Sequence, residues 1–134
     1  MGVISLCNAR TNHAIAGDVE FALTRKARRR GLLGRQAVDA PAALILSPCC
    51  AIHTAFMRFP IDVVFLDGQW RALRIVLEMP PWRGAIAAGA AVVIELPSGR
   101  LGTRDVAIGD RLFLRVDAWR TPKGALNLYC SIGS

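Results

Sequence analysis

The 134-residue sequence has no long hydrophobic run, and none approaches the roughly 20 apolar residues that a membrane-spanning helix requires. Its first residues, MGVISLCNARTNHA, also lack the early basic region and the extended apolar run of an export signal. We therefore expect a cytoplasmic protein without a transmembrane segment.

The motifs that mark common cofactor sites and catalytic centres are missing as well. The sequence contains no GxGxxG after a strand, no phosphate-cradling GxxxxGKS/T, no HExxH and no GxSxG. The four cysteines, at residues 7, 49, 50 and 130, do not form the two CxxC pairs of a typical structural zinc site. We expect reduced thiols, no bound metal and no cofactor.

Lysine is nearly absent, so the net charge of +7 comes almost entirely from arginine. Such a charge attracts nucleic acids, anionic lipids and acidic proteins. The run RKARRR at residues 25–30 is its densest part. A solvated basic surface explains this run, and we favour that interpretation over binding of phosphate or an acidic partner by the run. We also favour it over binding of nucleic acid or anionic lipid by the stretch Arg25 to Arg35.

What the sequence does contain is an abundance of short apolar runs. Hydrophobic residues make up 53% and charged residues 20%, which argues against a disordered chain and against a disulfide-dominated scaffold. A chain of this length fits one domain with one core. We predict a single domain over residues 1–120, a partly flexible tail over residues 121–134 that contains Pro122 and Gly124, and a monomeric protein.

The apolar runs predict a chain made mostly of strands. Ile61–Asp67 and Trp70–Leu77 are rich in β-forming residues, and Asp67-Gly68 between them suits the positive φ angles of a two-residue hairpin turn. Ala14–Ala16 and Val19–Leu23 predict a second hairpin. The further strands that we expect are Val3–Cys7, Ala42–Leu46, Val92–Leu96 and Leu112–Trp119.

One helix is predicted, from an N-cap at Thr24 to about Leu33, with Gly34 in the left-handed position that follows a helix. Its RKARRR segment is charged around nearly the whole circumference, so the helix offers few apolar contacts. A short helical turn is also expected over Ser98–Asp105.

Side chains with chemical potential are densest between Pro48 and Leu77, where Cys49, Cys50, His53, Met57, Arg58 and Asp62 gather. A loop with Trp82 and Arg83 follows this stretch, and either residue could line a cleft. Glu95 lies in an apolar strand, on the face of Val93. It is either buried with a partner or hydrated at a rim.

If His53, Arg58, Asp62 and Glu95 meet at one end of the sheet, they form a polar network in an apolar wall. That arrangement is typical of a small-ligand site, although a structural ion-pair network would give the same pattern. The binding residues that we predict are His53, Met57, Arg58, Asp62, Trp82, Arg83 and Glu95.

Cys49, Cys50 and His53 permit a second hypothesis, a thiol nucleophile beside a base that is oriented by Asp62 or Glu95. If the protein is an enzyme, these three residues are its catalytic candidates for hydrolysis or thiol transfer. Packed thiols and a hydrogen-bonded structural His53 explain the same residues, and we favour that interpretation.

Four segments together resemble DUF192 (UPF0127), a bacterial and archaeal domain family of unknown function. The segments are RRRGLLGR at Arg28–Arg35, IHTAFMRFPIDVVFLDG at Ile52–Gly68, IELPSG at Ile94–Gly99 and IGDRL at Ile108–Leu112. The resemblance covers about Asn8 to Leu114 and implies a barrel-like domain with small helical elements. The residues that match the family pattern are His53, Met57, Arg58, Pro60, Asp62, Glu95, Gly99, Gly109 and Asp110.

The strand count and the resemblance together predict a mainly β (α+β) fold, a compact single-domain β-barrel or sandwich-like arrangement with one or two short helices. We expect a non-enzymatic binding or accessory module that binds an unknown small ligand or protein partner near residues 53–62. The resemblance alone suggests a link to pilus assembly or secretion.

Overall fold

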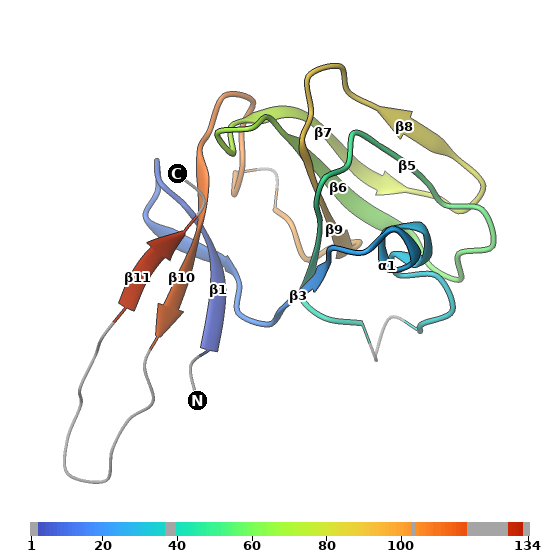
Figure 1. Cartoon of the computed structure of the whole chain (residues 1–134), viewed down its shortest axis with the longest axis horizontal. Coiled ribbons are helices and arrows are strands. Elements are labelled where there is room, and N and C mark those ends of the chain that lie inside the picture. The colour runs from blue at the N-terminus through green and yellow to red at the C-terminus, as the bar shows by residue number, and fades with distance from the viewer. Residues whose placement is uncertain (1–2, 37–39, 103, 118–128, 133–134) are drawn as a thin grey trace, which may run out of the picture.

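The computed structural model describes residues 3–36, 40–102, 104–117 and 129–132. Its strands form three sheets (Figure 1). A four-stranded sheet has the order β11-β10-β1-β2, a five-stranded sheet the order β3-β4-β9-β6-β7, and β5 pairs with β8. The mainly β fold with one short helix is confirmed, and the described strands make separate sheets rather than one closed barrel. The strands are β1 (Val3–Asn8), β2 (His13–Ala16), β3 (Val19–Ala22), β4 (Ala43–Leu46), β5 (Ala51–His53), β6 (Ile61–Leu66), β7 (Ala72–Met79), β8 (Gly84–Ile86), β9 (Val92–Pro97), β10 (Leu112–Asp117) and β11 (Tyr129–Ile132).

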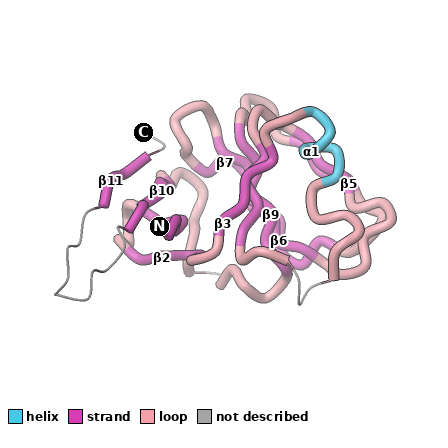
Figure 2. The backbone as a smooth tube through the Cα atoms, turned by 60° about the horizontal axis from the view of Figure 1, so that its bottom comes forward, coloured by secondary structure: helices cyan, strands magenta, loops and turns pink. Residues whose placement is uncertain are grey.

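The five-stranded sheet is the central layer, and apolar side chains cover both of its faces. Every residue of β4, β6 and β9 is buried, as continuous apolar runs predict for strands that are covered on both sides. One face packs against the four-stranded sheet through Val64, Ile94 and Leu114, among others. The other face carries a second core, against which α1, β5 and β8 pack (Figures 1 and 2).

The predicted hairpin of the central sheet is present as β6 and β7, but its turn differs from the prediction. Leu66 pairs with Ala72, so five residues connect the strands instead of two. The Asp67 carboxylate accepts the Gln69 and Arg71 amides at 2.8 and 3.0 Å, and the positive φ of 65° falls on Trp70. The side chain of Asp67 therefore builds this turn as an Asx turn, and a positive φ at Gly68 is not needed.

The second predicted hairpin is wrong, although both of its strands exist. β2 pairs antiparallel with β1, whereas β3 pairs in parallel with β4. Residues 17 and 18 thus carry the chain from one sheet to another. Although β2 and β3 are adjacent in sequence, they do not pair with each other.

The helix α1 (Arg25–Arg30) begins where the sequence predicts and ends earlier. The Thr24 hydroxyl accepts the Ala27 amide at 3.1 Å, which is the expected N-cap. Gly31, with φ of 50°, ends the helix, so the predicted end at Leu33 is wrong by three residues. The other predicted helical turn, over Ser98–Asp105, is non-helical in its described residues.

The C-terminal strands lie at the edge of the four-stranded sheet. β10 ends at Asp117, so the last two residues of the predicted strand Leu112–Trp119 lie outside the described residues. β11 pairs antiparallel with β10. The predicted domain boundary at residue 120 stays a prediction. Among the described residues, no helix has the length and apolarity to cross a membrane.

Candidate functional site

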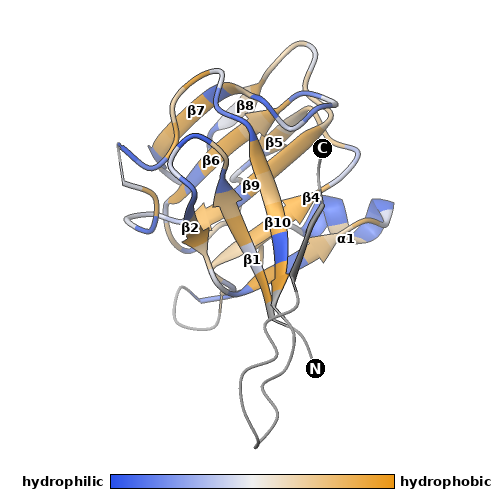
Figure 3. Cartoon of the chain, turned by 90° about the vertical axis from the view of Figure 1, so that its left-hand side faces the viewer, coloured by the Kyte–Doolittle hydropathy of each residue, from blue (hydrophilic) through white to orange (hydrophobic). Residues whose placement is uncertain are grey.

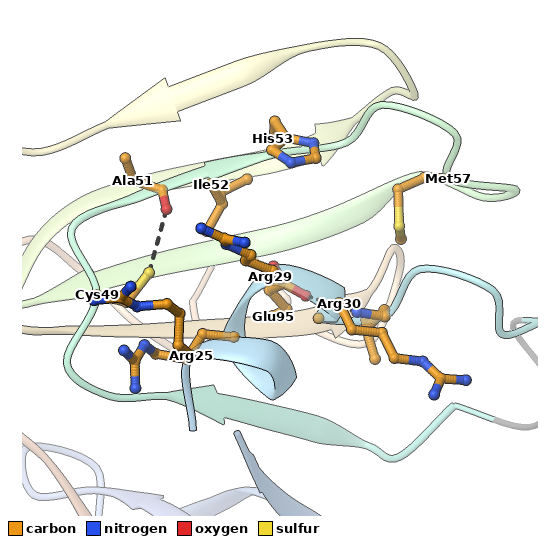
Figure 4. Close-up of a pocket in the computed structure, with 12 residues that line it drawn as sticks. Arg25, Arg29, Arg30, Cys49, Ala51, Ile52, His53, Met57 and Glu95 are labelled. Atoms are coloured by element: carbon orange, nitrogen blue, oxygen red, sulfur yellow. Dashed lines mark hydrogen bonds between the residues drawn. The ribbon is translucent and has the colours of Figure 1, made fainter. Parts of the chain in front are cut away.

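A cavity of about 220 Å³ opens on the second face of the central sheet (Figure 4). One wall comes from α1 and the turn behind it, a second wall from the segment that contains β5, and the floor from β9. Figure 3 shows the contrast between the hydrophilic helix and the hydrophobic strands beneath it. The helix side consists of Arg25, Arg28, Arg29, Arg30, Gly31 and Leu32, and the remaining lining residues are Cys49, Ala51, Ile52, His53, Met57 and Glu95.

Glu95 is the carboxylic acid of this cavity and is 4% exposed. Strand alternation places it on the face of Val93, as predicted, between the cross-strand neighbours Leu44 and Val63. Burial raises its pKa to about 7, and the Leu32 amide, which donates to Oε2 at 3.3 Å, opposes this shift. Of the two interpretations left open for Glu95, the structure shows the buried one, with a backbone amide as the partner.

The arginines of α1 are the charged lining residues that the sequence-based prediction did not include in the site. Arg28 donates to the Leu23 carbonyl, and the two ion pairs of the described residues, Arg10 with Asp110 and Arg35 with Glu20, leave the α1 arginines out. The signal that could have found them is the segment RRRGLLGR, because it is one of the four segments that carry the family resemblance. A charged helix on the surface has the same pattern, so charge alone could not decide.

Cys49 lines the cavity as a half-buried thiol that donates to the Ala51 carbonyl at 3.2 Å. Burial raises the pKa of this thiol, and the nearby charge of Glu95 adds to the effect. Cys50 is exposed and is not among the lining residues, whereas His53 is exposed and does line the cavity. Within the described ranges, no group of three His, Cys, Asp or Glu side chains is placed to hold a metal ion.

Asp62 lies on the opposite face of the central sheet from Glu95. Val63 pairs with Glu95 and Asp62 pairs with Leu96, so a one-residue offset separates the two carboxylates. Asp62 accepts the Glu78 amide at 2.8 Å and the Leu101 amide at 3.3 Å. The expected convergence is therefore wrong for Asp62, which connects β7 to the loop after β9.

Arg58, Trp82 and Arg83 are exposed and are not among the residues that line the cavity. Trp82 stacks edge-on against Phe56 with ring centroids 4.5 Å apart, and both residues have positive φ angles. Buried Thr54 holds the two loops together, because its hydroxyl donates to the Pro80 carbonyl at 2.7 Å and accepts the Arg83 amide at 2.8 Å. Of the predicted binding residues, His53, Met57 and Glu95 share the cavity.

The family model of DUF192, described as "Uncharacterized ACR", matches residues 6–114. The chain belongs to the DUF192 family. A UPF0127 protein from Thermococcus sibiricus is 32% identical over 131 residues, which cover 91% of this chain and 84% of that protein. The name of this relative states the family and no activity. It therefore assigns no role to the cavity of this DUF192 protein.

Two solved structures share the fold. A protein of unknown function from Novosphingobium aromaticivorans has a TM-score of 0.65 at 21% identity and covers 82% of each chain. A candidate transcription regulator from Sinorhizobium meliloti has a TM-score of 0.68 at 20% identity, with 83% of this chain and 91% of that chain covered. At this level of identity the likeness concerns the fold alone.

Proposed function

We propose that this DUF192 protein is a non-enzymatic binding module that holds a small ligand in the cavity between α1, β5 and β9. The observation that carries the proposal is the buried Glu95 carboxyl at the floor of a lined hollow. Ligand sites combine an apolar wall with a few placed polar groups, and Ile52, Met57 and Glu95 supply that combination. Of the site expected near residues 53–62, the proposal keeps His53 and Met57 and leaves out Arg58 and Asp62.

The thiol beside the cavity supports binding over catalysis. A nucleophilic cysteine needs a lowered pKa, because the thiolate is the reactive form. The pKa of Cys49 is raised, and its proton is used in a hydrogen bond to the Ala51 carbonyl. Pilus assembly or secretion as the setting of the protein stays an expectation from the family resemblance.

A thermal-shift screen of small metabolites against two tryptophan variants tests the proposal. Ala51→Trp adds a large side chain at an exposed residue of β5 that lines the cavity, and Ala88→Trp adds the same side chain at an exposed position outside it. We expect compounds that raise the Tm of the wild type and of Ala88→Trp but not of Ala51→Trp. If every compound that stabilises the wild type stabilises Ala51→Trp equally, the cavity is not a binding site and the proposal fails.

A nucleic-acid ligand would behave differently in the same variants. Phosphate-backbone binding depends steeply on salt and uses the exposed arginines without entering the hollow. The substitution Ala51→Trp would then leave the affinity for DNA unchanged. The proposal predicts weak, non-specific DNA binding in both tryptophan variants.

A further inference from the structure

Helix α1 concentrates positive charge at the cavity without a matching acid. It has no acidic residue in its first turn, and its last turn contains Arg28, Arg29 and Arg30. Arg25 repels Arg28 and Arg29, which lie three and four positions along the helix, because like charges at this spacing destabilise a helix. Among the described residues, no ion pair joins Glu95 to an arginine of this helix.

Two of these arginines face the hollow in the close-up of the cavity (Figure 4). Arg25 and Arg29 extend along the side that holds Cys49 and Ile52, whereas the Arg30 side chain points away from that segment. A guanidinium presents a planar fork of donors that matches the oxygens of phosphate and carboxylate groups. An anion seated between Arg25 and Arg29 would therefore relieve their repulsion and gain charge-assisted hydrogen bonds.

We propose that the cavity binds a small organic anion whose phosphate or carboxylate group lies between Arg25 and Arg29. The inference rests on the proposed binding function and adds the chemical class of the ligand. The apolar body of the ligand packs against Ile52 and Met57, and a polar group at its far end reaches the Glu95 carboxyl. A cavity of about 220 Å³ holds one ring-sized body, since an apolar cavity of about 150 Å³ already holds benzene.

The floor of the cavity makes anion binding depend on pH. A protonated Glu95 donates a hydrogen bond, while an ionised one places a negative charge beneath the ligand. The titratable and charged groups around it are the α1 arginines, Cys49 and His53, and its cross-strand neighbours Leu44 and Val63 are apolar. Binding is therefore tighter at pH 6 than at pH 8.

Phenyl phosphate and benzoate are suitable probes, with benzyl alcohol as the neutral comparison and inorganic phosphate as the anion without a body. Affinity is measured by titration calorimetry on the full chain, and the site is located by NMR shifts of the Leu32 amide. The double variant Arg25→Gln/Arg29→Gln removes the proposed anion contacts. Lys26→Gln is the matched control, because it removes one charge from the same helix turn on the side that faces a different hollow.

We expect an aromatic anion to bind more tightly than benzyl alcohol and to shift the Leu32 amide. The double arginine variant should weaken that binding about tenfold or more, and Lys26→Gln should change it less than about twofold. With benzoate, which is fully ionised throughout this range, Glu95→Gln should remove the difference between pH 6 and pH 8. Circular dichroism of each variant verifies that the fold is retained.

Three results would overturn the inference. Benzyl alcohol that binds as tightly as the anions, with no effect of the arginine variants, removes the anion class but leaves the binding proposal intact. An equal loss per charge removed in Lys26→Gln and in the double arginine variant indicates general electrostatic attraction and not a site. If no probe binds while other metabolites stabilise the wild type but not Ala51→Trp, the ligand belongs to another class.

Discussion

The turn that ends α1 is in direct contact with the buried acid of β9, because a Cβ atom placed on Gly31 would lie 2.9 Å from Glu95 Oε2. Gly31 also has φ of 50°, a region that residues with a side chain seldom adopt. The next residue, Leu32, donates its amide to the same oxygen. The end of α1 therefore contacts the Glu95 carboxyl closely, and this contact fixes the helix wall of the cavity relative to its floor on β9.

Replacing Gly31 by alanine should destabilise the protein by about 1–3 kcal/mol, because both the backbone angle and the contact with Glu95 become unfavourable. Gly34→Ala is the matched control, since Gly34 also has a positive φ but its nearest atom, on Arg30, is 4.0 Å away. Urea unfolding of both variants measures the difference. A loss in Gly31→Ala no larger than in Gly34→Ala would show that the contact with Glu95 costs nothing.

Stability should fall as pH rises through the titration of Glu95. The folded pKa of about 7 lies above the ordinary value of 4.5, so the folded state holds the proton more tightly. The contribution of this group is therefore complete below about pH 4.5 and is lost by the time pH passes about 7, up to about 3 kcal/mol in all. Urea unfolding of the wild type and Glu95→Gln between pH 4.5 and pH 8 tests this. A constant difference between them across that range would contradict the prediction.

A second carboxylate, Asp110, should make the stability of the protein depend on pH in the opposite sense, so that its contribution is lost as pH falls. It accepts from Arg10, Asn8 and the Ala107 amide, each at 2.8 Å, and these contacts, Arg10 first, lower its pKa to about 2. Its contribution is present above about pH 4 and is lost as pH falls toward 2. Asp110→Ala takes a partner from buried Asn8 and should cost about 1–3 kcal/mol in thermal or urea unfolding at pH 7. Arg10→Ala, on an exposed side chain, should cost much less, and equal losses would argue against this account.

The buried strands could be predicted from the sequence because a strand that is buried on both faces has a continuous run of apolar residues. The apolar run Ala42–Leu46 predicted a strand covered on both sides, and β4 is such a strand. No comparable sequence pattern shows which strand a given strand pairs with. β3 pairs in parallel with β4, some twenty residues away in sequence, and the turn between β2 and β3 therefore gave a false hairpin.

The site was predicted in part for the same reason. Alternation alone placed Glu95 on the face of Val93, which holds. The relation of Glu95 to Asp62 depends on the register between β6 and β9, and an offset of one residue sends Asp62 to the other face. Binding by the stretch Arg25 to Arg35 was the less favoured interpretation, because a solvated helix and a helix beside a cavity have the same charge pattern.

The loops that carry Phe56 and Trp82 should depend on Thr54. This residue is fully buried, and its hydroxyl joins the two loops through the Pro80 carbonyl and the Arg83 amide. Thr54→Val keeps the shape but leaves both groups without that partner, so we expect a loss of about 1–3 kcal/mol and faster hydrogen exchange at the Arg83 amide. Thr54→Ser keeps the hydroxyl and should preserve slow exchange. Equal exchange in the valine and serine variants would show that the hydroxyl does not hold the loops.

Alkylation of the two neighbouring cysteines separates the binding proposal from thiol catalysis. Cys49 donates its proton to the Ala51 carbonyl and its pKa is raised, chiefly by burial, whereas Cys50 is exposed. Iodoacetamide should therefore modify Cys50 first at pH 7, and the rate at Cys49 should rise only at a higher pH than for an ordinary thiol. Site-resolved mass spectrometry across pH 6–10 measures both rates, and Glu95→Gln should raise the rate at Cys49 slightly, because it removes a nearby negative charge. A rate at Cys49 that is already maximal near pH 7 would mean an activated thiolate, and the cavity would then have to be considered a catalytic site with His53 as the candidate base.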